Sequence, residues 1–386
     1  MKNNLLKTLS ALAVSTAVGV GGMASAMAEN VKIGMITTLS GGGSSLGIDV
    51  RDGFMLAIKQ SGRTDIDVMI EDDARKPDVA KQISDKFIQK EKVDILTGII
   101  WSNLAMAVVP PAVRQGVFYI SPNAGPSALA GKACHENYFN AAWQNDNLHE
   151  AMGGYVSAEG HKKPFILAPN YPAGKDALTG FKRFYTGELA GEVYTKLGQT
   201  DYAAEIAQIK ASGADSVYFF LPGGMGIAFM KQYSQSGVST PVFGPAFSFD
   251  QGILAAVGDA AVGVKNSSQW SKDIDTPANK AFVESFQKEY GRLPSLYASQ
   301  GFDSANLIIS AVEKAGGAKD ADAFRAALKA AEFTSVRGDF KFASNNHPIQ
   351  DIYVREVVKE GDVLTNKIVA VGLKGHANAY VDQCKM

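Results

Sequence analysis

The sequence offers few residues whose types and spacing suit catalysis. Its five histidines show no pairing at the spacing of a metal site or a catalytic triad: His135, His149, His161, His347 and His376. The sequence contains no phosphate loop that ends in lysine and serine. Because catalytic residues come together in space rather than in sequence, these absences disfavour an enzyme without excluding one.

Two other motifs suit chemistry, but each has a simpler interpretation. Residues 223–226, Gly-Gly-Met-Gly, follow a predicted strand and open a helix as a dinucleotide loop does, yet they lack its full spacing and favour a tight turn. The acidic run at 71–73 fits a carboxylate site or a solvated turn, and the turn is preferred. Cys134 and His135 have no second cluster of metal ligands, so we expect no metal and no cofactor.

The first 28 residues (1–28) have the layout of a cleavable secretory signal. Lys2 and Lys7 bracket a basic start, an apolar run covers 9–26, and small-x-small sites end at residues 26 and 28. We expect cleavage at the second site and a periplasmic location. The alternative is a membrane anchor, but serines, a threonine and glycines dilute the apolar run.

The composition is that of a globular protein. Hydrophobic residues make up 46% and charged residues 20%, and the formal net charge is −1. No basic stripe argues for nucleic acid, and no later run approaches the ~20 apolar residues that cross a bilayer. Because single cores stop growing near about 250–300 residues, the remaining chain predicts two lobes.

The chain has two cysteines, Cys134 and Cys384. An exported protein meets an oxidising compartment, and an even count permits one bridge between the C-terminal tail and the first half. The alternative is two buried free thiols. The predicted export favours the disulfide.

Short apolar runs alternate with helix-length amphipathic runs through most of the chain. Predicted strands lie at 31–37, 66–70, 93–97, 117–121, 165–168, 192–195, 216–221, 241–243 and 262–267. Predicted helices lie around 55–58, at 79–91, from 104, and at 173–189, 202–212, 225–237, 277–290, 296–315 and 321–331. Extended segments follow at 333–342 and 353–371, the second a hairpin turning at 360–362. This alternation predicts two doubly wound α/β lobes with parallel sheets.

Ligands of doubly wound sheets bind beyond the carboxyl ends of the strands. The loops at those ends are 40–47, 101–103, 122–126, 170–173, 222–225 and 245–249. Because they come from both predicted lobes, the sequence predicts a binding cleft shared between the lobes.

These features together resemble the solute-binding proteins of ABC importers, specifically the leucine/isoleucine/valine-binding type. The signal, the glycine-serine loop at 40–47, the segment 98–103 and Ile-Ser-Pro-Asn-Ala at 120–124 carry the resemblance. It implies two lobes joined by three hinge strands, no catalysis, a monomer, and membrane permease subunits as partners. The predicted lobes are 29–147 plus 275–348 and 148–274 plus 349–386.

The resemblance also implies how a carboxylate is held. In that family a serine at a helix start and backbone N–H groups after the next strand bind it. Ser102 matches the serine, and the loop matches with Asn123, Ala124 and Gly125. Unpaired N–H groups and the positive helix end near Asn103 suit an anion without a cationic side chain. Ser102 is also a plain N-cap candidate, and the two roles are compatible.

One departure from the family concerns the ligand's ammonium group. Amino-acid binders place a glutamate after the strand-glycine-proline turn, but here the turn continues with Ala246, Phe247 and Ser248, and Asp250 lies past it. A buried ammonium without its counter-charge costs several kcal/mol. The sequence therefore disfavours an ordinary amino acid as ligand.

Several motifs resemble a sub-branch that imports aromatic acids: Trp-Gln-Asn-Asp at 143–146, and the segments 170–176, 221–226, 297–303 and 337–340. This implies a small organic acid with one carboxylate and a flat apolar body, such as benzoate or a hydroxycinnamate. The predicted walls are Trp101, Trp143, Tyr171, Met225 and Phe247. Candidates to meet a ring hydroxyl are Gln144, Asn123 and Asp146, and Leu46 and Gly224 complete the predicted site. Alternatively, Trp143 and Phe247 are core residues.

The predicted mechanism is hinge closure, in which the ligand stabilises the closed form through contacts that it makes only there. Three alternatives remain from the sequence. They are a receptor for branched-chain or other amino acids, a ligand sensor that reports to a membrane receptor, and a periplasmic hydrolase.

Overall fold

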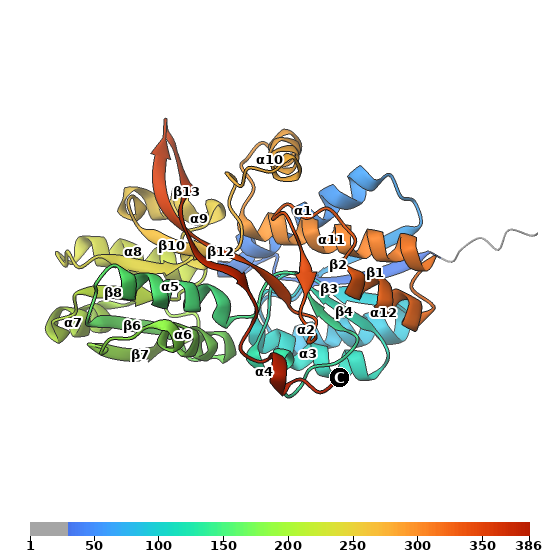
Figure 1. Ribbon diagram of the computed structural model, residues 1–386, viewed down its shortest axis with the longest axis horizontal. Coiled ribbons are helices and arrows are strands. Elements are labelled where there is room, and N and C mark those ends of the chain that lie inside the picture. Colours follow the sequence, from blue (N-terminus) through green and yellow to red (C-terminus); the bar gives the residue numbers. More distant parts are fainter. Residues whose placement is uncertain (1–29) are drawn as a thin grey trace, which may run out of the picture.

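The computed structural model describes residues 30–386, in which two α/β lobes lie side by side (Figure 1). The predicted signal at 1–28 lies outside the described residues. None of the helices within 30–386 has the length and apolar character that crossing a membrane requires.

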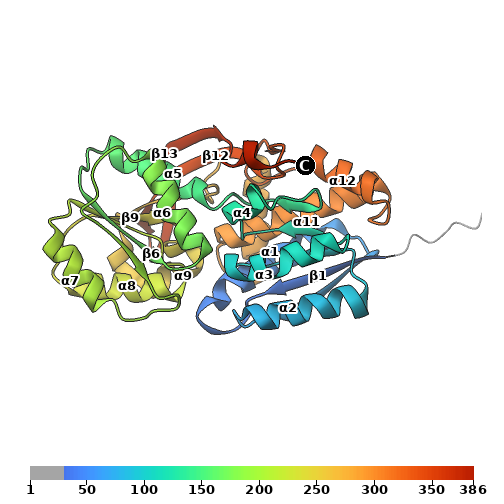
Figure 2. The ribbon, with the colours of Figure 1, turned by 90° about the horizontal axis from the view of Figure 1, so that it is seen from below.

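The first lobe is built on a parallel sheet of order β2-β1-β3-β4-β5. Its strands are β1 (Val31–Thr37), β2 (Ile66–Asp72), β3 (Ile95–Thr97), β4 (Phe118–Ser121) and β5 (Tyr138–Asn140). Its helices are α1 (Ser44–Ser61), α2 (Pro77–Lys86), α3 (Ser102–Arg114), α4 (Ser127–Ala130), α10 (Pro277–Tyr290), α11 (Leu296–Ala315) and α12 (Ala321–Ala330). Alternation along β1 buries Ile33 with Phe54 and Ile308, and Ile36 with Leu104 on the other face. Both faces of the sheet are therefore covered, as a parallel sheet requires (Figure 2).

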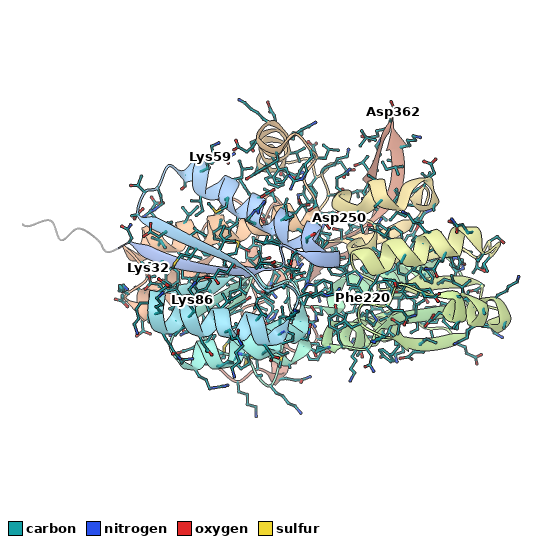
Figure 3. All side chains as sticks on the ribbon, turned by 180° about the vertical axis from the view of Figure 1, so that it is seen from behind. Lys32, Lys59, Lys86, Phe220, Asp250 and Asp362 are labelled. Carbon is teal, nitrogen blue, oxygen red and sulfur yellow. A yellow bond between two sulfur atoms is a disulfide. The ribbon has the colours of Figure 1, made fainter. Side chains whose placement is uncertain are left out.

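The second lobe repeats this plan with a mixed sheet of order β11-β12-β10-β9-β8-β6-β7. Its strands are β6 (Pro164–Pro169), β7 (Gly191–Thr195), β8 (Ser216–Phe219), β9 (Val242–Pro245), β10 (Lys265–Ser268), β11 (Lys341–Phe342), β12 (Pro348–Glu360) and β13 (Val363–His376). Its helices are α5 (Asp146–Ala158), α6 (Pro172–Phe184), α7 (Ala203–Ser212), α8 (Gly224–Gln235) and α9 (Gln251–Val257). The strands β6 to β10 pair in parallel, and β12 adds antiparallel pairing to β10 and β13. The predicted doubly wound lobes are confirmed, and the predicted hairpin projects from the second lobe with Asp362 at its tip (Figure 3).

The described chain crosses between the lobes after β5, after β10 and between α12 and β12, the stretch that contains β11. The lobe boundaries at residues 147, 274 and 348 stay predictions. Beyond β13 the C-terminal tail returns to the first lobe, where Cys384 forms a disulfide with Cys134 and Asn345 donates to Asn378 at 3.0 Å. The predicted bridge between tail and first half is thus present in the structure.

Several segments differ from the sequence-based expectation. Strand β5 and the short helices α4 and α9 were not predicted. Helix α5 was not predicted, although Leu148, Met152 and Val156 form a buried stripe at helical spacing. The segment 333–342 was predicted as extended, but only β11 is a strand. Asp303 of α11 accepts hydrogen bonds from the hydroxyl of Ser335 and from the backbone N–H of Val336, and these long-range contacts take the place of a strand ladder there.

Candidate functional site

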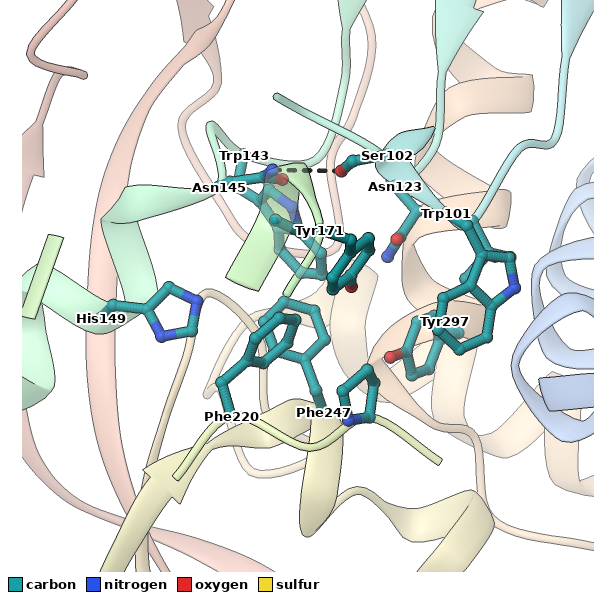
Figure 4. A pocket seen from close by; sticks show the side chains of 13 residues that line it. Trp101, Ser102, Asn123, Trp143, Asn145, His149, Tyr171, Phe220, Phe247 and Tyr297 are labelled. Atoms are coloured by element: carbon teal, nitrogen blue, oxygen red, sulfur yellow. Dashed lines mark hydrogen bonds between the residues drawn. The ribbon is translucent and has the colours of Figure 1, made fainter. Parts of the chain in front are cut away.

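A pocket of about 360 Å³ lies where strand ends of the two sheets face each other (Figure 4). The first lobe contributes Ile100, Trp101, Ser102, Asn123 and Tyr297. The crossing segment and the second lobe contribute Trp143, Asn145, His149, Tyr171, Ala173, Phe220, Pro222 and Phe247. The site therefore depends on both lobes.

The walls of the pocket are aromatic. Trp143 and Phe247 meet edge to face, with ring centroids 4.8 Å apart. Tyr171 stacks on Phe220 at 6.3 Å and lies 6.5 Å from Trp101. Such faces and edges complement a planar apolar ring. Trp143 and Phe247 are also buried, so their predicted wall and core roles coincide.

The first turn of α3 forms a site for an anion. The backbone N–H groups of Ser102 and Asn103 have no hydrogen-bond partner among residues 30–386, as expected at a helix start. Asn145 donates its side-chain amide to Ser102 Oγ at 3.1 Å, which leaves the Ser102 hydroxyl hydrogen available to a ligand. Together these donors suit a carboxylate at the positive end of the helix.

The loop after β4 is less available than its sequence suggested. The N–H of Ala124 already donates to Ile99 at 3.3 Å, and that of Gly125 donates to Asn145 Oδ1 at 3.1 Å. Only Asn123 of this loop lines the pocket, where its amide donates to Gln300 at 2.9 Å. The loop therefore orients Asn145 and supports Ser102 more than it offers backbone donors of its own.

The lining residues include no aspartate, glutamate, lysine or arginine. His149 is the titratable imidazole of the pocket, and burial lowers its pKa to about 3, so it is neutral at physiological pH. Asp250, the acid that follows the glycine-proline turn, does not line the pocket. It accepts the backbone N–H of Leu296 at 2.7 Å and lies 3.6 Å from Arg355. The pocket thus offers no carboxylate to an ammonium group.

Two predicted contacts to a ring hydroxyl point elsewhere. The Gln144 amide donates to Asp146 Oδ1 at 2.8 Å, and Asp146 also lies 2.8 Å from the guanidinium of Arg183. Neither Gln144 nor Asp146 lines the pocket. Asp146 is the first residue of α5 and lies on the helix face next to α6. The side chain of Gln144 is held away from the pocket by its hydrogen bond to Asp146.

Four further predicted residues lie beside the pocket rather than along its lining. Leu46 lies at the contact between the lobe tips, where the carbonyl of Gly42 also approaches Gly224. The sulfur of Met225 accepts the N–H of Gly198 at 3.2 Å. Asn103 Oδ1 is buried without a hydrogen-bond partner in the described part of the chain. Of the fourteen predicted residues, the lining set contains Trp101, Ser102, Asn123, Trp143, Tyr171 and Phe247.

The sequence did not single out several lining residues. Asn145 and His149 required helix α5 to be recognised, since they lie four positions apart on one of its faces. Tyr297 comes from the start of α11, far along the chain, and Phe220 follows the last residue of β8. Within residues 30–386 no group of three or more His, Cys, Asp or Glu side chains is placed to hold a metal ion.

The family model described as periplasmic binding protein matches residues 30–362, and the chain therefore belongs to the periplasmic binding protein family. A curated relative from Brucella melitensis, a Leu/Ile/Val-binding protein homolog, is 29% identical over 87% of this chain and 90% of its own length. The family predicted from the sequence is confirmed.

Two solved structures are similar to this chain in both fold and sequence. One is a solute-binding protein of an ABC transporter from Rhodopseudomonas palustris in complex with benzoate, with a TM-score of 0.87 and 31% identity over 92% of this chain and all of the other. The second is another solute-binding protein of that species in complex with 3,4-dihydroxybenzoic acid, with a TM-score of 0.84 and 30% identity over 90% and 98% of the two chains.

Proposed function

We propose that the protein is the periplasmic solute-binding component of an ABC importer and that it captures an aromatic monocarboxylate by closing its two lobes. The observation that carries the proposal is the pairing of an anion site at Ser102 with uncharged aromatic walls. The benzoate and dihydroxybenzoate complexes of similar proteins support it.

The interlobe contacts are those of a closed form. Ser127 of α4 donates its backbone N–H and its hydroxyl to Asp176 of α6, at 3.0 and 2.6 Å. On the other side of the pocket, the Gly42 carbonyl lies against Gly223. A ligand in the pocket would touch both lobes and so favour this form over an open one.

Binding of an amino acid fits this pocket poorly, although the curated relatives carry Leu/Ile/Val-binding names. The α-ammonium of leucine would be buried without a carboxylate partner, and that costs several kcal/mol. Catalysis also fits poorly, because Ser102 contacts the amide of Asn145 and has no base within hydrogen-bond distance. We therefore propose a binding protein without enzymatic activity.

A thermal-shift panel tests the proposal with benzoates, hydroxycinnamates, aliphatic keto acids, leucine and valine. A ligand at 100 times its Kd should add roughly 2.7 kcal/mol of stability. We expect the largest shifts with aromatic carboxylates. A large shift with leucine or valine and none with benzoates would contradict the proposed ligand class.

The same samples, incubated for hours and analysed by mass spectrometry, test the absence of catalysis. We expect esters and amides of aromatic acids to be recovered unchanged. A delivery role is tested separately by deleting the gene and measuring uptake of the aromatic acid that binds. Normal uptake would favour sensing over import.

A further inference from the structure

His149 lines the pocket from the end of the first turn of α5 and has no role in the anion site at Ser102. Its ring centroid is 5.0 Å from that of Phe220 and 6.1 Å from that of Phe247. In Figure 4 the His149 ring stands at the edge of the lining group and turns one nitrogen toward the pocket. The imidazole is therefore positioned to contact a ligand.

The protonation of this imidazole follows from its single hydrogen bond. His149 Nδ1 is paired with the hydroxyl of Tyr218, and this hydroxyl has no other partner in residues 30–386. A buried hydroxyl needs an acceptor for its hydrogen, so Tyr218 donates to Nδ1. The ring proton then resides on Nε2, which makes no hydrogen bond within the described chain.

Figure 4 shows His149 and Ser102 on opposite sides of the lining group. Ring contacts lead in sequence from Trp101, next to Ser102, through Tyr171 and Phe220 to His149. A flat ligand whose carboxylate sits at Ser102 would extend along these rings, so its opposite end would approach Nε2.

We propose that His149 is a specificity-determining residue whose Nε2–H donates to a neutral acceptor on the ligand ring, opposite the carboxylate. The inference rests on the proposed function and narrows its ligand class to aromatic monocarboxylates with a distal hydroxyl, carbonyl or ether oxygen. A second carboxylate is disfavoured, because the lining residues offer no cation to pair with it.

Calorimetric titration of four probes tests this assignment: 4-hydroxybenzoate, 4-methylbenzoate of nearly the same shape, benzoate and terephthalate. For the wild-type protein we expect 4-hydroxybenzoate to bind at least tenfold more tightly than 4-methylbenzoate, and terephthalate to bind more weakly than benzoate. H149F keeps a ring but removes the donor, and should bring the first two within about threefold of each other. H149Q places an amide N–H near the position of Nε2 and should restore part of the preference.

The outcomes separate the two proposals. If aromatic acids bind but the preference for 4-hydroxybenzoate is absent, or persists in a folded H149F protein, the role of His149 is overturned while the proposed function stands. If H149F does not fold, H149Q decides the question: a preference for 4-hydroxybenzoate that is kept at least in part in H149Q supports a neutral donor at this position, and a preference lost in H149Q overturns it. If no aromatic carboxylate binds the wild-type protein, both proposals fall.

Discussion

Neighbouring residues at the start of helix α5 face two different polar environments. Asn145 and His149 face the pocket, where no lining side chain carries a charge at neutral pH. Asp146 and Glu150, each one residue later, face Arg183 in a charged cluster. Because residues four apart share a helix face, a shift of one position moves a side chain from one environment to the other.

The polar groups of the charged cluster are paired with one another, whereas those of the pocket keep unused donors. Arg183 contacts both Asp146 and Glu150, whose side chains are almost completely buried. The Tyr380 hydroxyl donates to Asp146 at 2.8 Å, and His376 Nε2 lies 2.5 Å from Glu150. Burial alone would raise the pKa of Glu150, but the hydrogen bond and charges of His376 and Arg183 hold that pKa below its ordinary value.

The difference teaches which polar residues serve folding and which serve the ligand. Residues of the cluster satisfy one another and hold the C-terminal segment, including Tyr380, against α5 and α6. Ser102 and His149, in contrast, each keep a donor that no group of the described chain accepts. Buried polar groups are normally paired, so unused donors in a cavity point to a ligand.

Breaking the cluster should have the largest effect, on stability and not on ligand preference. Arg183→Met removes the guanidinium that the buried Asp146 and Glu150 side chains share and should cost about 3–5 kcal/mol of unfolding free energy in urea titrations. The neighbouring Lys182→Met removes a partly exposed pair with Glu192 and should cost less than about 1 kcal/mol. Equal losses in the two variants would contradict the structural role of the cluster.

Removing the hydroxyl donor of the anion site should affect ligand affinity and not stability. Ser102→Ala deletes a charge-assisted hydrogen bond of about 1.5–3 kcal/mol, so calorimetry should show benzoate affinity falling roughly 10- to 100-fold. Ser157→Ala, which alters a serine of α5 outside the pocket, serves as the control and should leave affinity unchanged. An unaffected Kd in Ser102→Ala would place the carboxylate elsewhere.

The pH dependence of stability distinguishes the pocket histidine. The pKa of His149 is about 3 in the folded protein and about 6.5 when unfolded. Between these values the unfolded chain binds more protons, so this group's contribution to stability falls as pH drops below about 6.5. At pH 5 the loss of stability caused by His149 amounts to about 2 kcal/mol, and His149→Gln should abolish this loss. We expect the stability difference between wild type and variant to change by that amount from pH 8 to pH 5, and a constant difference would refute it.

A smaller effect on ligand affinity is expected from a change in the aromatic walls of the pocket. Phe247→Leu keeps an apolar surface but removes the edge-to-face partner of Trp143. Aromatic contacts contribute about 0.5–1.5 kcal/mol, so benzoate affinity should fall about threefold to tenfold. Cyclohexanecarboxylate, which lacks a π face, should lose less. Equal losses for both acids would show that the wall acts by shape alone.

The sequence was sufficient for the fold because strand and helix periods recur with short connections. The bounds predicted for α10 and α11, 277–290 and 296–315, match the structure. Helix α5 was not predicted because buried polar residues at its start interrupt the helical pattern of apolar residues. The glycines at 153 and 154 also argue against a helix. In the structure Gly153 is required, because the carbonyl of Phe181 approaches too closely for a Cβ atom.

The site was only partly predictable for the same reason. Residues that come soon after the strand ends, such as Trp101, Ser102 and Tyr171, are predictable from the topology of a parallel sheet. Which way a polar side chain points depends on helix phase and on tertiary partners. Asp146 was therefore predicted in the site and Asn145 was not, since only the packing of α5 on α6 distinguishes them.

The central claim is that the pocket accepts a carboxylate on an aromatic body and rejects an adjacent ammonium. Phenylacetate and L-phenylglycine differ only by that ammonium, so competitive calorimetry with this pair tests the claim most directly. We expect phenylacetate to bind at least 100-fold more tightly, which corresponds to about 2.7 kcal/mol. Equal affinities, or tighter binding of phenylglycine, would contradict the account.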